Sequence, residues 1–479
     1  MMKSTYIIIL LMWCSSFFAQ KTSFDFHKKY SVKEIKEDID YTEKYLTKFH
    51  PDPYRYCSKD SLHAFIEHVK AKIDTPLTEM QLRFYIKQIV AKIGCGHSDA
   101  AASKGYAKAV KTLNRPILPI NAFIVDTNHL IVLNNLSSDT SIKAGDELLS
   151  INNRSSNQIL KTIYSIYTSD GFNETYKKQG IKYSWFKYYY SFCYGFHPNY
   201  TLKIKNTSGV ISTHTLQSIS SHKDTTILPI KNASTAIYKT KTCQFSLVND
   251  NTKIAVIDID AFKGIGWRRF MKRSFRTIKA AGIKNLVIDL RENGGGQIAD
   301  GMNLLSYLVP KTTWLPFDRK PNLIPLNPRI KMGPFARISP ILFSSFMPQW
   351  PKNGRLRHYF VSVPKKKLLF KGNLYVLVNG KSFSMSAVTA SYLKYKADAT
   401  IIGEETGGNI AGSNAVLSGK LILPNSKIKM QIPIYHIYHN IDVTNNARGL
   451  MPDYPTHYTS EDILKSVDVD LKKVLELVN

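Results

Sequence analysis

The sequence predicts an α/β protein whose core follows a helical segment and a β-rich segment. Residues 30–113 carry apolar side chains at i, i+3, i+4 and i+7 spacing, which is typical of amphipathic helices. Residues 141–152 place a Gly-Asp turn before a short apolar strand. From residue 254 onward strand and helix patterns alternate, which favours a parallel sheet with right-handed βαβ crossovers.

Length and composition indicate a globular protein of more than one domain. The chain has 479 residues, of which 43% are hydrophobic and 11% aromatic, so each domain can bury a core. The net charge of +29 is compatible with nucleic acid, with an anionic envelope surface or with acidic substrates. No nucleic-acid fold signature accompanies this charge, so we expect no nucleic-acid partner. The envelope surface stays open as a partner, beside plain solubility.

The first 20 residues have the pattern of a secretory signal peptide. Lys3 precedes an apolar run over 6–13 that is too short to span a bilayer, and small residues precede a cleavage position near Gln20. Trp13 before Cys14 disfavours lipid attachment at that cysteine. The rest of the chain has no spanning stretch. We therefore expect a soluble, exported protein, periplasmic or extracellular, with envelope association left open.

Four further cysteines, Cys57, Cys95, Cys193 and Cys243, are widely spaced and form neither a CxxC motif nor a metal-ligand pattern. One or two disulfides are compatible with an exported protein, but the spacing does not decide their pairing. We expect no metal and no cofactor. Cys95 has no motif of its own and is a poor candidate nucleophile.

Residues 371–409 contain the main candidate for catalysis. An apolar strand over 374–378 is broken by Asn-Gly, and a helical pattern then begins at Ser384. A hydroxyl at this junction is exposed at the sheet edge, and the next N–H, that of Met385, is an unpaired helix donor that can face an oxyanion. This resembles a nucleophile elbow, although GxSxG is absent. The alternative is that Ser382, Ser384 and Ser386 are cap and loop serines.

A second stretch, residues 284–296, reads KNLVIDLRENGGG. Its apolar half predicts a buried strand, and the following turn contains three glycines. Such a turn lets a ligand approach the backbone and presents N–H groups to it. It is not a phosphate-binding loop, because no G-K-[ST] follows.

DLRENGGG, VLVNGKSFSMSA and IIGEETGG, in this order, resemble the C-terminal-processing (tail-specific) serine peptidases. The chain is closer to their tricorn-core-like Ser/His branch than to the Ser/Lys branch. The resemblance implies a ClpP/crotonase-like catalytic core and hydrolysis of peptide bonds in unfolded or C-terminal segments of proteins. The alternative is a catalytically inactive relative that binds peptides or hydrophobic ligands. Esterase activity is a third and weaker hypothesis, because the GxSxG motif is absent.

The resemblance also implies roles for single residues. Ser384 would be the nucleophile, and Met385 N–H with the N–H of Gly295 or Gly296 would bind the oxyanion. His97 follows a Gly-Cys-Gly sequence that ends a helix, and nothing in this local pattern indicates a catalytic role. The Ser/His branch, however, places its general base after such a helical segment, so the resemblance implies that His97 is the base for Ser384.

This sequence departs from the family motifs at two positions, and the residue that would orient His97 therefore stays open. The Ser/Lys branch has a lysine where this chain has Asn409. The carboxylate expected before the final Gly-x-x-Pro-Asp falls at about Asn446, with Asp442 a few residues earlier. An Asn can orient a histidine, but it stabilises imidazolium less than a carboxylate does.

Residues 117–163 resemble a PDZ domain, whose members add an extended peptide to a sheet edge. Gly145 and Asp146 lie in the turn that carries the resemblance, and we assign them to substrate binding. The alternative is an ordinary hairpin with a Gly-Asp turn. The usual carboxylate-binding loop is not visible near 118–119, so recognition of a free C-terminus is doubtful.

The expected domains follow. They are a signal peptide over 1–20, a helical domain over 21–113, a PDZ-like domain with an aromatic-rich extension over 114–221, a linker over 222–244 and the peptidase core over 245–479. The core contains a basic, irregular insertion over 310–371, either a lid or a solvated variable segment. An amphipathic helix is expected over 461–478.

Overall fold

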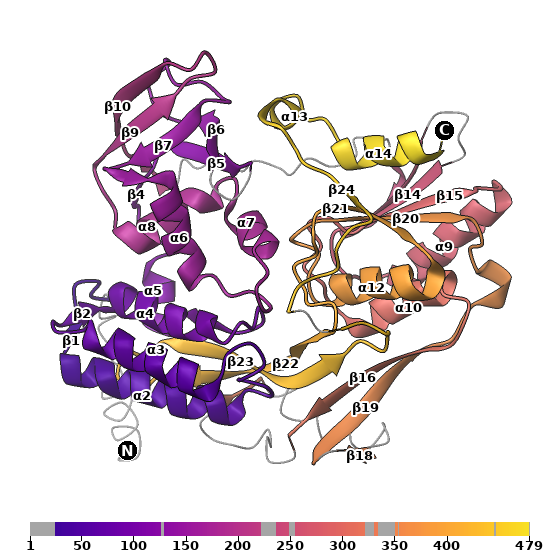
Figure 1. Cartoon of the computed structure of the whole chain (residues 1–479), viewed down its shortest axis with the longest axis horizontal. Coiled ribbons are helices and arrows are strands. Elements are labelled where there is room, and N and C mark those ends of the chain that lie inside the picture. Colours follow the sequence, from indigo (N-terminus) through magenta and orange to yellow (C-terminus); the bar gives the residue numbers. More distant parts are fainter. Residues whose placement is uncertain are drawn as a thin grey trace, which may run out of the picture.

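The structure is a computed structural model and describes residues 24–125, 129–221, 236–248, 254–320, 330–333, 350–352, 354–444 and 447–478. The predicted signal peptide therefore lies outside the described residues. Figure 1 shows an α/β core with a helical region and a β domain stacked beside it. No helix of the described part is long and apolar enough to cross a membrane.

A seven-stranded sheet forms the centre of the core. Its order is β12-β13-β14-β15-β20-β21-β24, and the strands from β14 to β24 are parallel, as the alternating pattern predicts. The bounds are Ala236–Lys239 (β12), Cys243–Leu247 (β13), Ile254–Ile259 (β14), Asn285–Asp289 (β15), Asn373–Val378 (β20), Thr400–Gly403 (β21) and Tyr454–Pro455 (β24).

Helices cover both faces of this sheet (Figure 1). On one face lie α9 (Trp267–Ala280), α10 (Ile298–Leu308) and α12 (Met385–Ala397), and on the other lies α14 (Val469–Val478). Alternate strand residues therefore enter two different apolar clusters: Ile257 and Val376 pack with the three helices, and Val256 and Leu377 pack with α14. Every residue of α12 from 385 to 393 is buried, so this helix is buried all round and not on one face only.

A second, antiparallel seven-stranded sheet runs beneath the core. Its order is β17-β22-β23-β16-β19-β18, with β3 paired to β23. The bounds are Ile330–Lys331 (β17), Gly412–Ile422 (β22), Lys429–Tyr438 (β23), Thr313–Arg319 (β16), Arg355–Ser362 (β19), Trp350–Lys352 (β18) and Asp99–Ala101 (β3).

The helical region packs on this second sheet (Figure 1). Its elements are β1 (Lys29–Tyr30), α2 (Val32–Phe49), α3 (Lys59–Ala71), β2 (Leu77–Thr78), α4 (Glu79–Lys92) and α5 (Lys104–Ala109). Asp38, buried on α2, accepts hydrogen bonds from the N–H of Asn425 and Ser426 at 2.9 Å each. These bonds fix α2 to the β22–β23 turn, because a buried carboxylate needs such donors.

The β domain is a six-stranded antiparallel sheet with helices packed on it. The order is β10-β9-β7-β6-β5, with β8 on β7. The bounds are Ile120–Ile124 (β5), Leu130–Asn135 (β6), Glu147–Ile151 (β7), Arg154–Ser155 (β8), Asn199–Lys205 (β9) and Ile211–Gln217 (β10), with helices Ser156–Ile166 (α6), Thr175–Ile181 (α7) and Trp185–Tyr194 (α8). Beside it, β4 (Pro116–Ile117) pairs with β11 (Ile219–Ser220).

Three expectations need correction. Residues 236–239 and 243–247 are strands of the core sheet and not linker; the rest of the expected linker lies mostly outside the described residues. The insertion over 310–371 is not irregular where described, since β16 and β19 form a long ladder within it. The tail is two helices, α13 (Ser460–Leu464) and α14, because Ser466 adopts a φ of 54° that ends the first.

The four cysteines within the described residues are free thiols. The disulfides that export allows are therefore not formed among Cys57, Cys95, Cys193 and Cys243. Burial raises the pKa of Cys95 to about 12, so its thiol is protonated at neutral pH and is a poor nucleophile, as the sequence suggests.

Candidate active site

Ser384 occupies a strained turn between β20 and α12. Its φ is 55° and its ψ is −124°, a combination that costs free energy for any residue with a Cβ and that recurs at nucleophile elbows. Glycines make room for the turn: a Cβ on Gly295 would lie 2.8 Å from Ser384 Cβ, and one on Gly408 would lie 2.7 Å from Ala387 Cβ. The glycine runs of the sequence thus allow two loops to pack against the elbow.

Of the three serines near the elbow, Ser384 alone lines a large cavity. Ser382 is buried, and its Oγ donates to Leu290 O at 2.8 Å and accepts from Asn379 N–H at 3.0 Å. Ser386 is buried within α12. Ser384 is half-buried on the wall of a cavity of about 740 Å³, large enough for substrate side chains. The two cap-like serines are structural, and the middle one is placed to react.

Two backbone amides point to an oxyanion site beside Ser384. No described group accepts a hydrogen bond from the N–H of Met385, the first residue of α12, or from the N–H of Gly296, and both residues line the cavity. Gly295 N–H, by contrast, donates to Asn293 Oδ1 at 2.8 Å. The N–H of Gly295 is therefore engaged within its own loop, whereas the N–H of Gly296 is a free donor at the cavity.

Strand pairing places His97 on the same cavity. β3 begins two residues after His97 and pairs with β23, and Gln431 Nε2 donates to His97 O at 3.1 Å. The imidazole stacks on the Phe383 ring at 4.5 Å between centroids, and that ring stacks on Tyr176 at 4.4 Å. Phe383 directly precedes the elbow serine, so the stack fixes the histidine ring relative to Ser384.

His97 is in the form that a general base requires. Burial lowers its pKa to about 4, so the imidazole is neutral at pH 7. Within the described residues, no hydrogen bond joins it to Ser384 Oγ, and its buried Nδ1 has no partner. Catalytic hydrogen bonds are often long before substrate binds and shorten in the Michaelis complex.

Asp170 holds the loop that carries His97, and sequence reasoning missed it. Its buried carboxylate accepts a hydrogen bond from Gly96 N–H at 2.8 Å. Burial raises its pKa to about 6, while the N–H groups of Gly96 and Asn409 act in the opposite direction. The carboxylate thereby links the histidine loop to the loop beside the elbow. The only local signal is an Asp-Gly pair, with Gly171 at a φ of 60°.

Comparison with known proteins identifies the part of the chain that contains Ser384. Residues 253–456 match the family model described as peptidase family S41. The chain carries an S41 peptidase domain. This match indicates a serine-type peptidase, and the matched range contains the elbow and the glycine loop but neither His97 nor Asp170.

Solved structures share the fold well beyond the S41 domain. Mature CPAF has a TM-score of 0.65 at 14% identity, over 93% of this chain and 97% of that chain. CPAF complexed with lactacystin has a TM-score of 0.66 at 14% identity, over 93% and 98%. The photosystem II D1 C-terminal processing protease matches with a TM-score of 0.43 at 14% identity, over 93% of this chain and 97% of that chain.

Asp442 and Asn409, two other residues singled out in the sequence, do not line the cavity. Asp442 is exposed and does not line it, and Asn446 lies outside the described residues. Asn409, at the position of the lysine of the Ser/Lys branch, accepts a hydrogen bond from Ala411 N–H at 2.8 Å and so shapes its own loop.

Gly145 and Asp146 also lie away from the cavity of the S41 domain. Gly145 has a φ of 94°, as a tight turn before β7 requires. Asp146 is buried and accepts a hydrogen bond from Lys143 N–H at 2.7 Å. The Asp146 carboxylate therefore holds its own turn.

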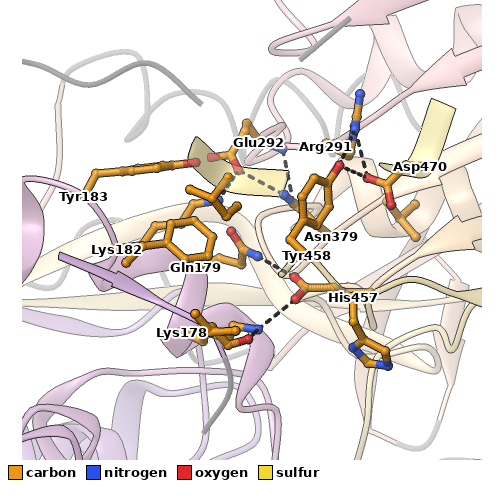
Figure 2. A pocket seen from close by; sticks show the side chains of 15 residues that line it. Lys178, Gln179, Lys182, Tyr183, Arg291, Glu292, Asn379, His457, Tyr458 and Asp470 are labelled. Carbon is orange, nitrogen blue, oxygen red and sulfur yellow. Dashed lines mark hydrogen bonds and ion pairs between the residues drawn. The ribbon is translucent and has the colours of Figure 1, made fainter. Parts of the chain in front are cut away.

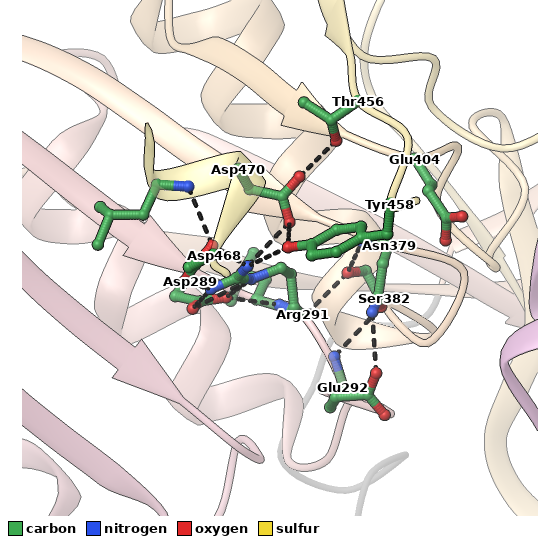
Figure 3. A network of polar contacts seen from close by, with 12 residues as sticks. Asp289, Arg291, Glu292, Asn379, Ser382, Glu404, Thr456, Tyr458, Asp468 and Asp470 are labelled. Carbon is green, nitrogen blue, oxygen red and sulfur yellow. Dashed lines mark hydrogen bonds and ion pairs between the residues drawn. The ribbon is translucent and has the colours of Figure 1, made fainter. Parts of the chain in front are cut away.

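A buried arginine anchors the start of the glycine loop (Figure 3). Arg291 donates to Asp289 on β15 at 2.7 Å and to Asp468 and Asp470 at 2.7 and 2.8 Å. Tyr458 Oη donates to Asp470 at 2.9 Å. A fully buried guanidinium needs such carboxylates, so the loop is tied to the N-terminal end of α14 and the residue before it.

The next residue ties the loop to the β domain. Glu292 Oε1 lies 2.9 Å from Lys182 Nζ, just after α7, and also accepts from Asn379 Nδ2 at 2.9 Å (Figure 2). Nearby, Lys178 Nζ lies 3.0 Å from Glu404 Oε1. The cavity between these pairs measures about 40 Å³, too small for a peptide, and does not include Ser384. This small cavity belongs to a polar contact between the core and the β domain and is not a substrate site.

A bulge in β22 shapes the opposite wall of the cavity. The pairing of β22 with β23 shifts register between Ala415 and Ser418, and Val416 adopts a φ of 69°. A β-branched residue in this region is strained, and such strain concentrates at functional sites. Val416 and Leu417 both line the cavity. Their backbone groups are thus released from the ladder where substrate would lie.

Proposed function

We propose that the chain is an exported serine-type endopeptidase that cleaves unfolded or C-terminal segments of proteins. One observation carries this proposal: Ser384 in an elbow conformation, a neutral His97 and the free N–H groups of Met385 and Gly296 all border one cavity. These are the nucleophile, base and oxyanion donors that acyl transfer needs.

In the first half of the reaction, Ser384 Oγ attacks the carbonyl carbon of the scissile bond while His97 accepts the hydroxyl proton. The N–H groups of Met385 and Gly296 bind the carbonyl oxygen as it becomes negative, and one such donor typically contributes about 3 kcal/mol. His97 then gives its proton to the leaving amine, and the acyl group stays on Ser384.

In the second half, a water molecule attacks the acyl-enzyme and His97 accepts a proton from it. The C–O bond to Ser384 breaks, the serine regains a proton from His97, and the carboxylate product leaves. Asp170 is the positioning residue, because its carboxylate accepts a hydrogen bond from Gly96 N–H and so fixes the loop before His97.

The walls of the cavity support an extended, apolar substrate segment. Ile298, Val388 and Ile437 line it, so apolar side chains next to the scissile bond are favoured. Several side chains of one segment can enter this cavity only when the segment is extended, which favours unfolded segments and chain ends as substrates. We further propose that the core is ClpP/crotonase-like and that the β domain is PDZ-like and holds substrate by strand addition, with Gly145 and Asp146 shaping its turn.

The proposed location rests on sequence. The apolar run over 6–13 supports export to the periplasm or beyond, and the net charge of +29 supports contact with an anionic envelope surface. Accumulation of the full-length chain in the cytoplasm with residues 1–20 intact would overturn export. Co-sedimentation with anionic vesicles, compared at low and high salt, tests the surface contact.

Degradation of a reduced, carboxymethylated protein by the purified chain tests the peptidase proposal. Ser384→Ala should abolish cleavage and labelling by a fluorophosphonate, and His97→Ala should lower both at least 100-fold. Ser418→Ala is the matched control, because Ser418 lines the same cavity on β22. Equal activity in the Ser384→Ala and Ser418→Ala variants would exclude Ser384 as nucleophile.

The second candidate is an inactive relative that binds peptides or hydrophobic ligands. The observation that favours it is the lack of a hydrogen bond between Ser384 Oγ and His97 among the described residues. This candidate predicts that an unfolded peptide protects the cavity without being cleaved, and that no fluorophosphonate reacts. Any serine-dependent turnover excludes it.

A further inference from the structure

A second large cavity lies outside the S41 domain, between the helical region and the β domain. It measures about 380 Å³ and is formed by α4, α5 and α8 with the chain before β4. Six aromatic residues line it, namely Tyr106, Trp185, Tyr188, Tyr189, Phe192 and Phe196. Its size and apolar walls are those of a small-molecule site.

The charged residues of this cavity all have the same sign. Arg83, Lys87, Lys111 and Arg115 line it, and no acidic residue does. The chain has 65 Lys and Arg against 36 Asp and Glu, so unpaired cations are common on its surface. Arg83 and Arg115 differ from those, because the Nε atom of each is buried and has no hydrogen-bond partner.

Glu79 and Asp99, the acidic residues that act on Arg83, already have other partners. Glu79 accepts from both Ser103 N–H and Ser103 Oγ at 2.7 Å, and Asp99 pairs with Lys87. No ion pair joins Arg83 or Arg115 to an acid within the described part of the chain. Two cations thus remain without an anion at an apolar cavity, which is unfavourable unless another group compensates them.

Aromatic rings compensate them only in part. The Arg83 guanidinium lies 4.7 Å from the centroid of Phe192 and 5.2 Å from that of Tyr106, and that of Arg115 lies 5.4 Å from Phe196. These contacts stabilise the charge but accept no N–H in the plane of the guanidinium. The in-plane donors keep the fork geometry that binds a carboxylate with two parallel hydrogen bonds.

We propose that this cavity binds a small carboxylate with an apolar tail. The tail would pack among the aromatic side chains, and the carboxylate would accept hydrogen bonds from Arg83 and Arg115. A neutral compound of equal length would leave both cations unpaired, and a cationic one would be repelled. The proposal does not depend on peptidase activity, since none of its residues borders the cavity of Ser384.

Octanoate and 1-octanol are a matched pair of probes for this site. Trp185 is 59% exposed on the cavity lining, so its fluorescence reports occupancy, and Trp185→Phe shows which part of the signal is its own. At fixed ionic strength, octanoate should change the fluorescence saturably and bind at least ten-fold more tightly than octanol. Equal binding of the two probes would overturn the assignment.

Substitutions assign the effect to the cations. Arg115→Gln should weaken octanoate binding at least five-fold and leave octanol binding unchanged, and Arg83→Gln should do the same if it folds. Lys104→Gln removes an exposed cation of α5 outside the cavity and is the control. Octanoate binding that falls equally in Lys104→Gln and Arg115→Gln would show general charge attraction and refute the site.

Discussion

Replacing Gly295 by alanine should disable the peptidase, whereas the same change at Gly294 should not. A Cβ at Gly295 would lie 2.8 Å from Ser384 Cβ and 2.9 Å from both Met385 N and Phe383 O. A Cβ at Gly294 would find no atom within 4 Å. The two adjacent glycines thus make a matched pair that differs in its contact with the elbow.

The size of the effect follows from these distances. Ordinary Cβ contacts begin at 3.4 Å, so the loop and the elbow have to separate by roughly half an ångström. Oxyanion donors act within about 2.7–3.1 Å, and a shift of this size removes Met385 N–H or Gly296 N–H from that range. Losing one donor lowers kcat about 100- to 1000-fold. The φ of 100° at Gly295 adds backbone strain.

The assay compares cleavage of an unfolded protein and the rate of fluorophosphonate labelling for the two variants and the wild type. We expect Gly294→Ala within about three-fold of wild type, and Gly295→Ala at least 100-fold slower in both readouts. Thermal unfolding shows whether each variant is folded. A folded Gly295→Ala protein with near-normal kcat would refute the placement of the oxyanion site beside this loop.

Three other predictions test the buried polar and charged groups around the site. Lys182→Met should lower the free energy of unfolding, measured by urea titration, by about 3 kcal/mol, because it leaves Glu292 charged and mostly buried. Adding Glu292→Gln should recover most of this loss. A double variant that is no more stable than Lys182→Met would contradict the stabilising ion pair between Lys182 and Glu292. Asp170→Ala should lower kcat more than it raises KM, because Gly96 N–H loses its acceptor and the loop that carries His97 is no longer fixed. Asp170→Asn keeps an acceptor oxygen and should retain most of the activity, so equal losses in the two variants would contradict this role. Stability should fall between pH 6.5 and 4, because burial lowers the pKa of five described histidines, three of them to about 3 or 4, and the unfolded chain binds their protons first. Asp170, with its pKa raised to about 6, opposes this only in part, so a profile that is flat over this range would contradict the prediction. The three histidines are His50, with a pKa of about 3, and His97 and His439, each about 4.

The sequence was most informative where structure is local. A strand, an Asn-Gly break and a helix lie within residues 374–397, so the elbow at Ser384 could be predicted from periodicity and turn chemistry alone. The same holds for the parallel strands of the core, which the alternating strand and helix pattern from residue 254 onward predicts. The glycine loop after β15 could be predicted from its three consecutive glycines.

Contacts between distant segments could not be predicted in this way. His97 reaches the cavity because β3 pairs with β23 more than 300 residues later, and family resemblance was the only reason to select it. Asp170 has no motif, and its role depends on one hydrogen bond to Gly96. The sequence of the basic insertion does not predict its strands clearly, because β19 carries two arginines among its apolar residues and periodicity is weak where both faces are partly exposed.

The backbone of Ser384 has a consequence for anyone who wants a more robust form of this protein. A serine held at a φ of 55° and a ψ of −124° stores free energy that glycine would not, so Ser384→Gly should raise the melting temperature while removing the nucleophile. Selection for thermal stability alone would therefore favour loss of catalysis at this position. The same variant would be a useful trap, since it keeps the cavity, the free amides and His97 and could hold an uncleaved substrate.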